Sequence, residues 1–194
     1  LSGIGVVVWL AVLFCLLMNM LNLPVMMQVA GLFSDRNLGG AAVAGIALGF
    51  FDLGACIGGL LYGKFYKIMK KWIFSVFYVT STVGTFLILT SQNIVVFVLG
   101  LFIVAVSGSQ VFPAQFQWMG LKTPKYAVPL ATSLIAGFGS LGSFIATPYM
   151  NVLKAVFGET RTSAMVVVIV CYLSFAVIFA FIKPFKDADA VQQA

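Results

Sequence analysis

Long apolar runs alternate with short polar connectors along the whole chain. A helix needs about 20 apolar residues to cross a bilayer, and six runs reach that length, at roughly 4–32, 40–62, 73–91, 93–113, 127–153 and 163–182. The strict alternation of barrel strands is absent from stretches such as VVVIVCYLSFAVIFAFI. Because backbone groups in lipid must satisfy their own hydrogen bonds, the pattern predicts an all-α integral membrane protein with six transmembrane helices. We expect a six-helix bundle over residues 1–183 and a cytoplasmic tail over residues 184–194.

The apolar runs contain a repeat with an offset of 88 residues. The segment GFFDLGACIGGLLYG (49–63) aligns with GFGSLGSFIATPYMN (137–151), and five of fifteen positions are identical. Similar composition of Gly- and Phe-rich helices is the simpler explanation of these identities. However, the same offset also places the first run on the fourth and the third on the sixth. Each unit has three spans, an odd number, so the units cross the membrane in opposite directions, as do the inverted repeats of secondary transporters.

Composition makes lipid the solvent for most of the chain. Hydrophobic residues make up 62% of the sequence and charged residues 8%, whereas a soluble domain has about 25% charged residues. The net charge is +6, but the basic residues lie in the connectors, which indicates membrane orientation and not nucleic-acid binding. The chain opens with LSGIGVVVWL, without an initiator Met, and we expect it to be a piece of a longer protein.

The basic residues are unequally divided between the two sides of the predicted bundle. One side has eight of them: Lys64, Lys67, Lys70, Lys71, Lys122, Lys125, Lys183 and Lys186. The other side has three: Arg36, Lys154 and Arg161. Because cytoplasmic loops carry the basic excess, both termini should be cytoplasmic, in a plasma or inner membrane.

The sequence lacks the residues that several kinds of catalytic and metal-binding sites require. There is no histidine, and the three cysteines lie in three different apolar runs, so we expect no metal site, no cofactor and no disulfide framework. Asp52 is the only acid in the core of a span, and no Gly-x-Ser-x-Gly elbow occurs, which argues against an intramembrane enzyme. A six-span oligomeric channel or membrane scaffold stays open as the alternative to a transporter, although no run of filter residues is present.

The order of spans and the basic connector after the second span resemble the C-terminal six-helix half of a major facilitator superfamily transporter. The family's loop pattern, Gly-x-x-x-Asp-Arg/Lys-x-Gly-Arg/Lys-Arg/Lys, is similar to GLLYGKFYKI (59–68) in a degenerate form. Gly59, Lys64 and Lys67 match the pattern, whereas Gly63 replaces the acid and Tyr66 replaces the second glycine. The resemblance covers essentially the whole chain, and the partner it implies is a missing N-terminal six-helix half.

Asp52 lies near the middle of the second span, where a charge costs about 2.5–3.5 kcal/mol. Its helix face carries mostly small residues: Gly45, Gly49, Asp52, Cys56, Gly59 and Gly63. The matching face of the fifth span carries Ser133, Gly137, Ser140, Phe144, Thr147 and Asn151. The resemblance implies that these faces dock on the missing half, because small residues allow close helix approach. Asp52, with Ser140, is either a proton-coupling residue or a structural contact between the halves, and the structural role is slightly favoured.

Two pairs of polar residues lie within the first and fourth spans. Asn19 and Asn22 are three residues apart and share a helix face. Their repeat mates Ser107 and Gln110 share a face of the fourth span. The resemblance implies that these helices contribute solute contacts to a central cavity, and helix-to-helix hydrogen bonds of about 1 kcal/mol are the alternative. We therefore expect half of a secondary active transporter that works by alternating access on a small solute, which the sequence does not identify.

Overall fold

The computed structural model describes residues 5–158 and 161–185, and these residues form helices joined by short turns, without a strand among them. The long helices are α1 (Val6–Asp35), α2 (Ala41–Met69), α3 (Ile73–Thr90), α4 (Ile94–Lys122), α5 (Val128–Phe157) and α6 (Arg161–Ile182). Single 3₁₀ turns, η1 (Lys70–Trp72) and η2 (Lys125–Ala127), precede α3 and α5. Five helical stretches in the described residues are long and apolar enough to cross a membrane, and one of them, Ala41–Thr90, contains α2, η1 and α3.

Several helices continue beyond the ends that the apolar runs predict. The predicted second span ends at residue 62, but α2 continues to Met69, because Phe65 and Tyr66 still pack against the core. The predicted fourth span ends at residue 113, but α4 continues through Pro113 to Lys122. Trp118 on this extension is buried and contacts Phe74 at a ring distance of 6.1 Å. Aromatic packing therefore carries these helices past the ends of their apolar runs.

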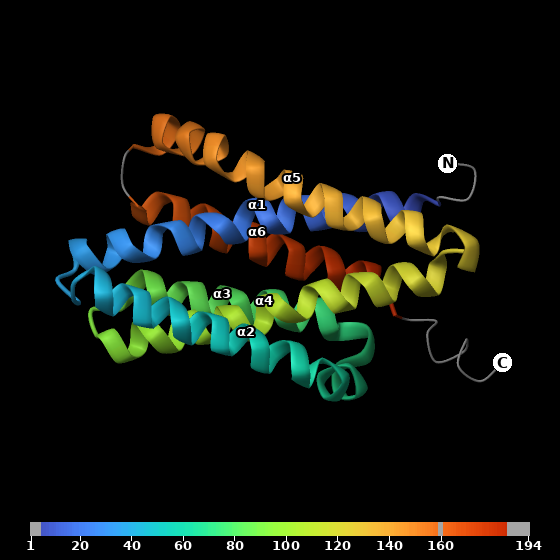
Figure 1. Cartoon of the computed structure of the whole chain (residues 1–194), viewed down its shortest axis with the longest axis horizontal. Helices are drawn as coiled ribbons and strands as arrows, with labels where there is room; N and C mark the ends of the chain where they lie inside the picture. The colour runs from blue at the N-terminus through green and yellow to red at the C-terminus, as the bar shows by residue number, and fades with distance from the viewer. Residues whose placement is uncertain (1–4, 159–160, 186–194) are drawn as a thin grey trace.

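Four helices form a row in which α5 packs on α1, α1 on α4, and α4 on α2 (Figure 1). Helices α3 and α6 pack against each other and against α4 and α1 respectively. An aromatic cluster fills the contact between α3 and α6. Phe74 stacks on Phe179 with ring centroids 4.6 Å apart, and Tyr78 stacks on Phe179 at 5.6 Å. The α2–α3 and α4–α5 turns lie at the same end of the bundle as the start of α1 and the end of α6 (Figure 1).

Glycines allow three close helix crossings. A Cβ on Gly142 of α5 would overlap the carbonyl oxygen of Leu16 on α1. A Cβ on Gly58 of α2 would lie 2.6 Å from the Val106 carbonyl oxygen on α4. Where α3 crosses α4, a Cβ on Gly84 would lie 2.8 Å from the Gly100 carbonyl oxygen. Each contact is with backbone, which cannot rotate away, so the helix separation at these crossings requires glycine.

Arg36, in the α1–α2 connector, caps the end of α3. Its guanidinium donates hydrogen bonds to the carbonyl oxygens of Ile88 (2.6 Å), Leu89 (2.6 Å) and Ser91 (2.7 Å). It also lies over the Phe97 ring, 5.9 Å from the centroid. The last carbonyls of a helix have no partner within the helix, so one side chain satisfies groups that would otherwise be unpaired and joins two connectors.

The end of the described chain packs onto the α2–α3 turn. Lys183 places its ammonium over the Trp72 ring, 4.8 Å from the centroid. Phe185, which the sequence places in the tail, is buried and stacks on Phe74 at 5.9 Å. These contacts fix the end of α6 beside the lysine-rich turn.

Candidate functional site

Asp52 lies on a face of α2 that no other described helix covers. All six members of its stripe are exposed: Gly45, Gly49, Asp52, Cys56, Gly59 and Gly63. Within the described residues, Asp52 has neither a hydrogen bond nor an ion pair. The opposite face of α2 is the buried one, where Gly54 and Gly58 pack on α4.

The corresponding stripe on α5 is exposed along its whole length. Its members are Ser133, Gly137, Ser140, Phe144, Thr147 and Asn151. Phe144 is 77% exposed, and a Cβ on Gly137 would meet no atom within 4 Å. The hydroxyl of Ser140 bonds only its own helix, through the Ala136 carbonyl oxygen at 3.2 Å. The two stripes lie on the two outer helices of the row α5–α1–α4–α2.

The two asparagines of α1 have different surroundings. The Asn19 amide donates to the Cys15 carbonyl oxygen at 2.9 Å, within its own helix, and lies near Gly139 of α5. The amide oxygen of Asn22 accepts a hydrogen bond from the hydroxyl of Tyr172 on α6. Tyr172 is fully buried, so this bond joins α1 to α6 inside the bundle.

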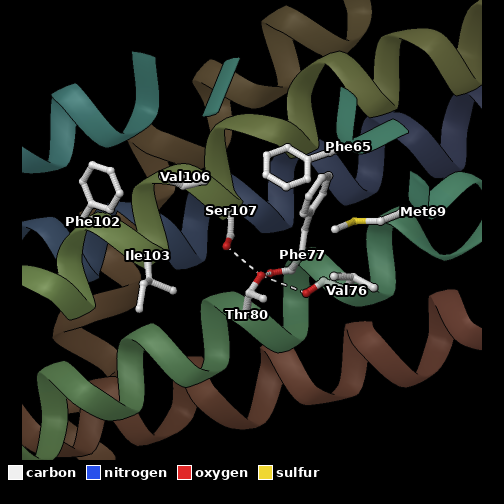
Figure 2. Close-up of a pocket in the computed structure, with 9 residues that line it drawn as sticks. All are labelled: Phe65, Met69, Val76, Phe77, Thr80, Phe102, Ile103, Val106 and Ser107. Carbon is white, nitrogen blue, oxygen red and sulfur yellow. Dashed lines mark hydrogen bonds between the residues drawn. The ribbon is translucent and has the colours of Figure 1, made fainter. Parts of the chain in front are cut away.

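The polar pair on α4 bonds to neighbouring helices. The amide nitrogen of Gln110 donates to the Gly58 carbonyl oxygen of α2 at 2.6 Å, and its amide oxygen has no partner among the described residues. The Ser107 hydroxyl lies 2.7 Å from the hydroxyl of Thr80 on α3. Thr80 also donates toward the Val76 carbonyl oxygen at 2.9 Å (Figure 2). In this conformation, both residues connect helices.

The degenerate loop motif lies within the last turns of α2. Gly59, Gly63, Lys64 and Lys67 are all exposed, and the helix continues through them to Met69. The motif is therefore helical in this chain, with the turn itself formed by η1. Its polar positions face away from the neighbouring helices.

Sequence reasoning missed three polar groups that the structure places in or beside the bundle. Gln115 on α4 is 1% exposed, and neither of its amide atoms has a hydrogen-bond partner in the described part of the chain. Tyr172 bonds Asn22, and Tyr62 of α2 donates to the side chain of Gln117 on α4 at 2.5 Å. A tyrosine or glutamine in an apolar run gives no signal of its partner, because each partner is distant in the sequence. Among the described residues, no group of three or more Cys, Asp or Glu side chains could hold a metal ion.

Comparison with known proteins supports the fold described above. Neither the curated proteins nor the solved structures give a significant match. The family model of the Major Facilitator Superfamily matches residues 4–193, nearly the entire chain. The match coincides with apolar helices long enough to cross a membrane several times. The chain therefore belongs to the Major Facilitator Superfamily, a family of membrane transporters.

Proposed function

We propose that the chain is the C-terminal half of a secondary active transporter that moves a small solute by alternating access. Its bundle over residues 1–183 has six spans in two inverted three-helix units, and the tail over 184–194 and the N-terminus are cytoplasmic. The protein resides in a plasma or inner membrane. The missing partner is an N-terminal half with its own six helices.

The glycine crossings support the inverted repeat. The offset of 88 residues pairs α1 with α4, α2 with α5 and α3 with α6. Gly142 of α5 contacts α1 at Leu16, and its mate Gly54 of α2 contacts α4 at Phe102 and Ala105. The mate of Leu16 is position 104, between those two residues. A pseudo-twofold axis that exchanges the two units accounts for both crossings.

The connectors support the orientation. Arg36 joins the α1–α2 connector to the end of α3, so these two lie at one end of the bundle. The lysine-bearing turns η1 and η2 lie at the other end (Figure 1). The larger basic charge is expected on the cytoplasmic side.

The observation that carries the proposal is the pair of uncovered stripes on α2 and α5, with Asp52 in one and Ser140 in the other. A carboxylate facing hydrocarbon is costly, so intramembrane acids face protein or a water-filled cavity. Small residues around it allow another helix to approach closely. We assign these stripes to the contact with the missing half, and Asp52 to proton coupling or to holding that contact.

The amides of the inner helices are the candidates for solute contact. Asn19, Asn22 and Gln110, together with the Ser107 hydroxyl, lie on α1 and α4, the two central helices of the row. Gln115 joins this set, because a buried amide without partners costs about 1–3 kcal/mol unless water or a ligand satisfies it. Rearrangement of α4 would turn these amides from helix-to-helix bonds toward a solute.

Transport by the full-length protein in proteoliposomes tests this proposal. Asp52→Asn keeps the shape of the side chain and removes its charge, and Cys56→Ser, one turn along the same stripe, is the matched control. If Asp52 couples transport to protons, Asp52→Asn still exchanges solute across the membrane but loses its response to a pH gradient. If Asp52 is a structural contact, the variant keeps the pH response and assembles less well. Solute flux that neither saturates nor accelerates with solute on the far side would contradict alternating access and favour a channel.

A further inference from the structure

A pocket of about 210 Å³ lies between α2, α3 and α4, outside the contact assigned to the missing half. Phe65 and Met69 of α2 form one wall, Val76 and Phe77 of α3 another, and Ile103 is among the α4 residues that complete it (Figure 2). Pockets for drug-sized molecules are about 300–1,000 Å³, so this one fits a shorter and simpler group.

The two polar residues in the pocket already have partners. Thr80 and Ser107 hydrogen-bond to each other at 2.7 Å, and Thr80 also bonds the Val76 and Phe77 carbonyl oxygens. The remaining lining residues are apolar. A polar solute would therefore lose its hydration without gaining new hydrogen bonds here, whereas a hydrocarbon chain would lose nothing.

The pocket lies where hydrocarbon can reach it. Helices α2 and α3 both pack along α4 but make few contacts with each other, so the pocket is open on the side away from α4. Thr80 is eight residues beyond Trp72, the last residue of η1 before α3 begins, which places it roughly 12 Å along α3. Trp72 is 41% exposed and is suited to the membrane interface. The pocket thus lies within the leaflet on the lysine side.

The turn beside the pocket carries concentrated positive charge. Lys70 and Lys71, both exposed, lie in η1, the turn between the pocket-lining residues Met69 of α2 and Val76 of α3. The sequence has no acidic residue between Asp52 and Glu159. Basic clusters beside a membrane helix attract anionic lipid, with about 1 kcal/mol for each residue.

We propose that the pocket holds one acyl chain of an anionic phospholipid, whose phosphate binds the lysines of the α2–α3 turn. The ligand class follows from the combination of an apolar pocket of limited volume with a lysine-bearing turn beside it. The inference rests on the membrane-spanning fold alone and does not depend on transport or on the role of Asp52.

Native mass spectrometry of the delipidated protein, titrated with dioleoyl phosphatidylglycerol or dioleoyl phosphatidylcholine, tests the proposal. We expect one phosphatidylglycerol to bind at least tenfold more tightly than phosphatidylcholine. Lys70→Gln and Lys71→Gln, in the α2–α3 turn, should each weaken phosphatidylglycerol binding by about fivefold. Lys125→Gln, in the other lysine-bearing turn, is the matched control and should change nothing. Glycerol 3-phosphate, which has the charge without the chains, should not bind.

Filling the pocket separates chain binding from surface charge. Val76→Phe and Ile103→Phe, from two walls, should each abolish the tight phosphatidylglycerol site. Val79→Phe, at an exposed position of α3, should leave the phosphatidylglycerol site unchanged and so controls for folding. If both filling variants retain tight binding while the lysine variants lose it, the lipid is held by charge alone and the pocket assignment is wrong. Equal affinity for the two lipids would also overturn the proposal.

Discussion

Arg36 stabilises the end of α3 through the shape of its side chain as well as through its charge. Three carbonyl oxygens at the end of α3 accept its hydrogen bonds, and all three bonds are 2.6 or 2.7 Å long. Charge-assisted bonds of this length are roughly twice as strong as neutral ones. The planar guanidinium reaches the carbonyls of Ile88, Leu89 and Ser91 at once, which a point charge on a flexible stem cannot do equally well.

Arg36→Gln should lower the free energy of unfolding by about 3 kcal/mol, since it removes charge-assisted bonds and leaves helix-terminal carbonyls without donors. Arg36→Lys should recover less than half of that loss. Unfolding in detergent, followed by circular dichroism, measures both changes. Lys64→Gln, on an exposed position, should stay within about 0.5 kcal/mol of the wild type. Equal stability of Arg36→Gln and Lys64→Gln would show that the cap contributes nothing.

At the scale of the helices, the two proposed repeat units differ at one crossing. Gly84 and Gly100 bring α3 and α4 into backbone contact. Their repeat mates are Tyr172 and Val12, which have side chains where the first pair has none. Accordingly α6 makes less contact with α1 than α3 makes with α4. The Tyr172 side chain fills the space between α6 and α1 and donates a hydrogen bond to Asn22.

Gly142→Ala should destabilise the bundle by about 1–3 kcal/mol, because the added methyl group meets the Leu16 backbone and overpacks the α1–α5 crossing. Gly137→Ala, on the open face of the same helix, should leave the stability of the bundle unchanged or slightly raise it. Thermal unfolding of the two variants side by side measures the difference. A Gly142→Ala protein as stable as Gly137→Ala would mean that α5 is farther from α1 than described.

At the scale of the whole molecule, the uncovered stripes of α2 and α5 are spaced by the two helices between them. Large apolar side chains flank the stripes, among them Phe50 at 46% and Leu141 at 42% exposed. Small residues at Gly49 and Gly137 leave room for a neighbouring backbone. Both features fit a partner bundle that contacts α2 and α5 and leaves a space in front of α1 and α4.

Gly49→Trp should abolish co-purification of the bundle with a separately expressed N-terminal half, because the indole would occupy the space that we propose for a helix of that half. The bundle itself should fold normally, because a Cβ on Gly49 meets nothing within 4 Å. Val83→Trp, on an exposed position of α3, is the control and should co-purify like the wild type. Affinity capture of a tagged bundle measures both. Normal capture of Gly49→Trp would place the contact with the other half elsewhere.

The sequence predicted the helices because lipid leaves the backbone few alternatives, and a run of apolar residues is enough to detect that constraint. It also predicted which residues share a face of α2, since this follows from helical spacing alone. The apolar runs do not show how far α2 and α4 continue, because Phe65 and Trp118 extend these helices through contacts that no local pattern records. The partners of Arg36 and Asn22 were likewise out of reach, since they are 52–55 and 150 residues away.

The cap on α3 also has a consequence for biosynthesis. Arg36 is made 55 residues before Ser91, its most distant partner, and at about 5–20 residues per second the ribosome needs roughly 3–11 s to make that segment. During this interval a guanidinium at the membrane surface has no helix end to cap. The connector becomes fixed only when α3 has been made and inserted, so α1, α2 and α3 should settle in the membrane together as the first folding unit.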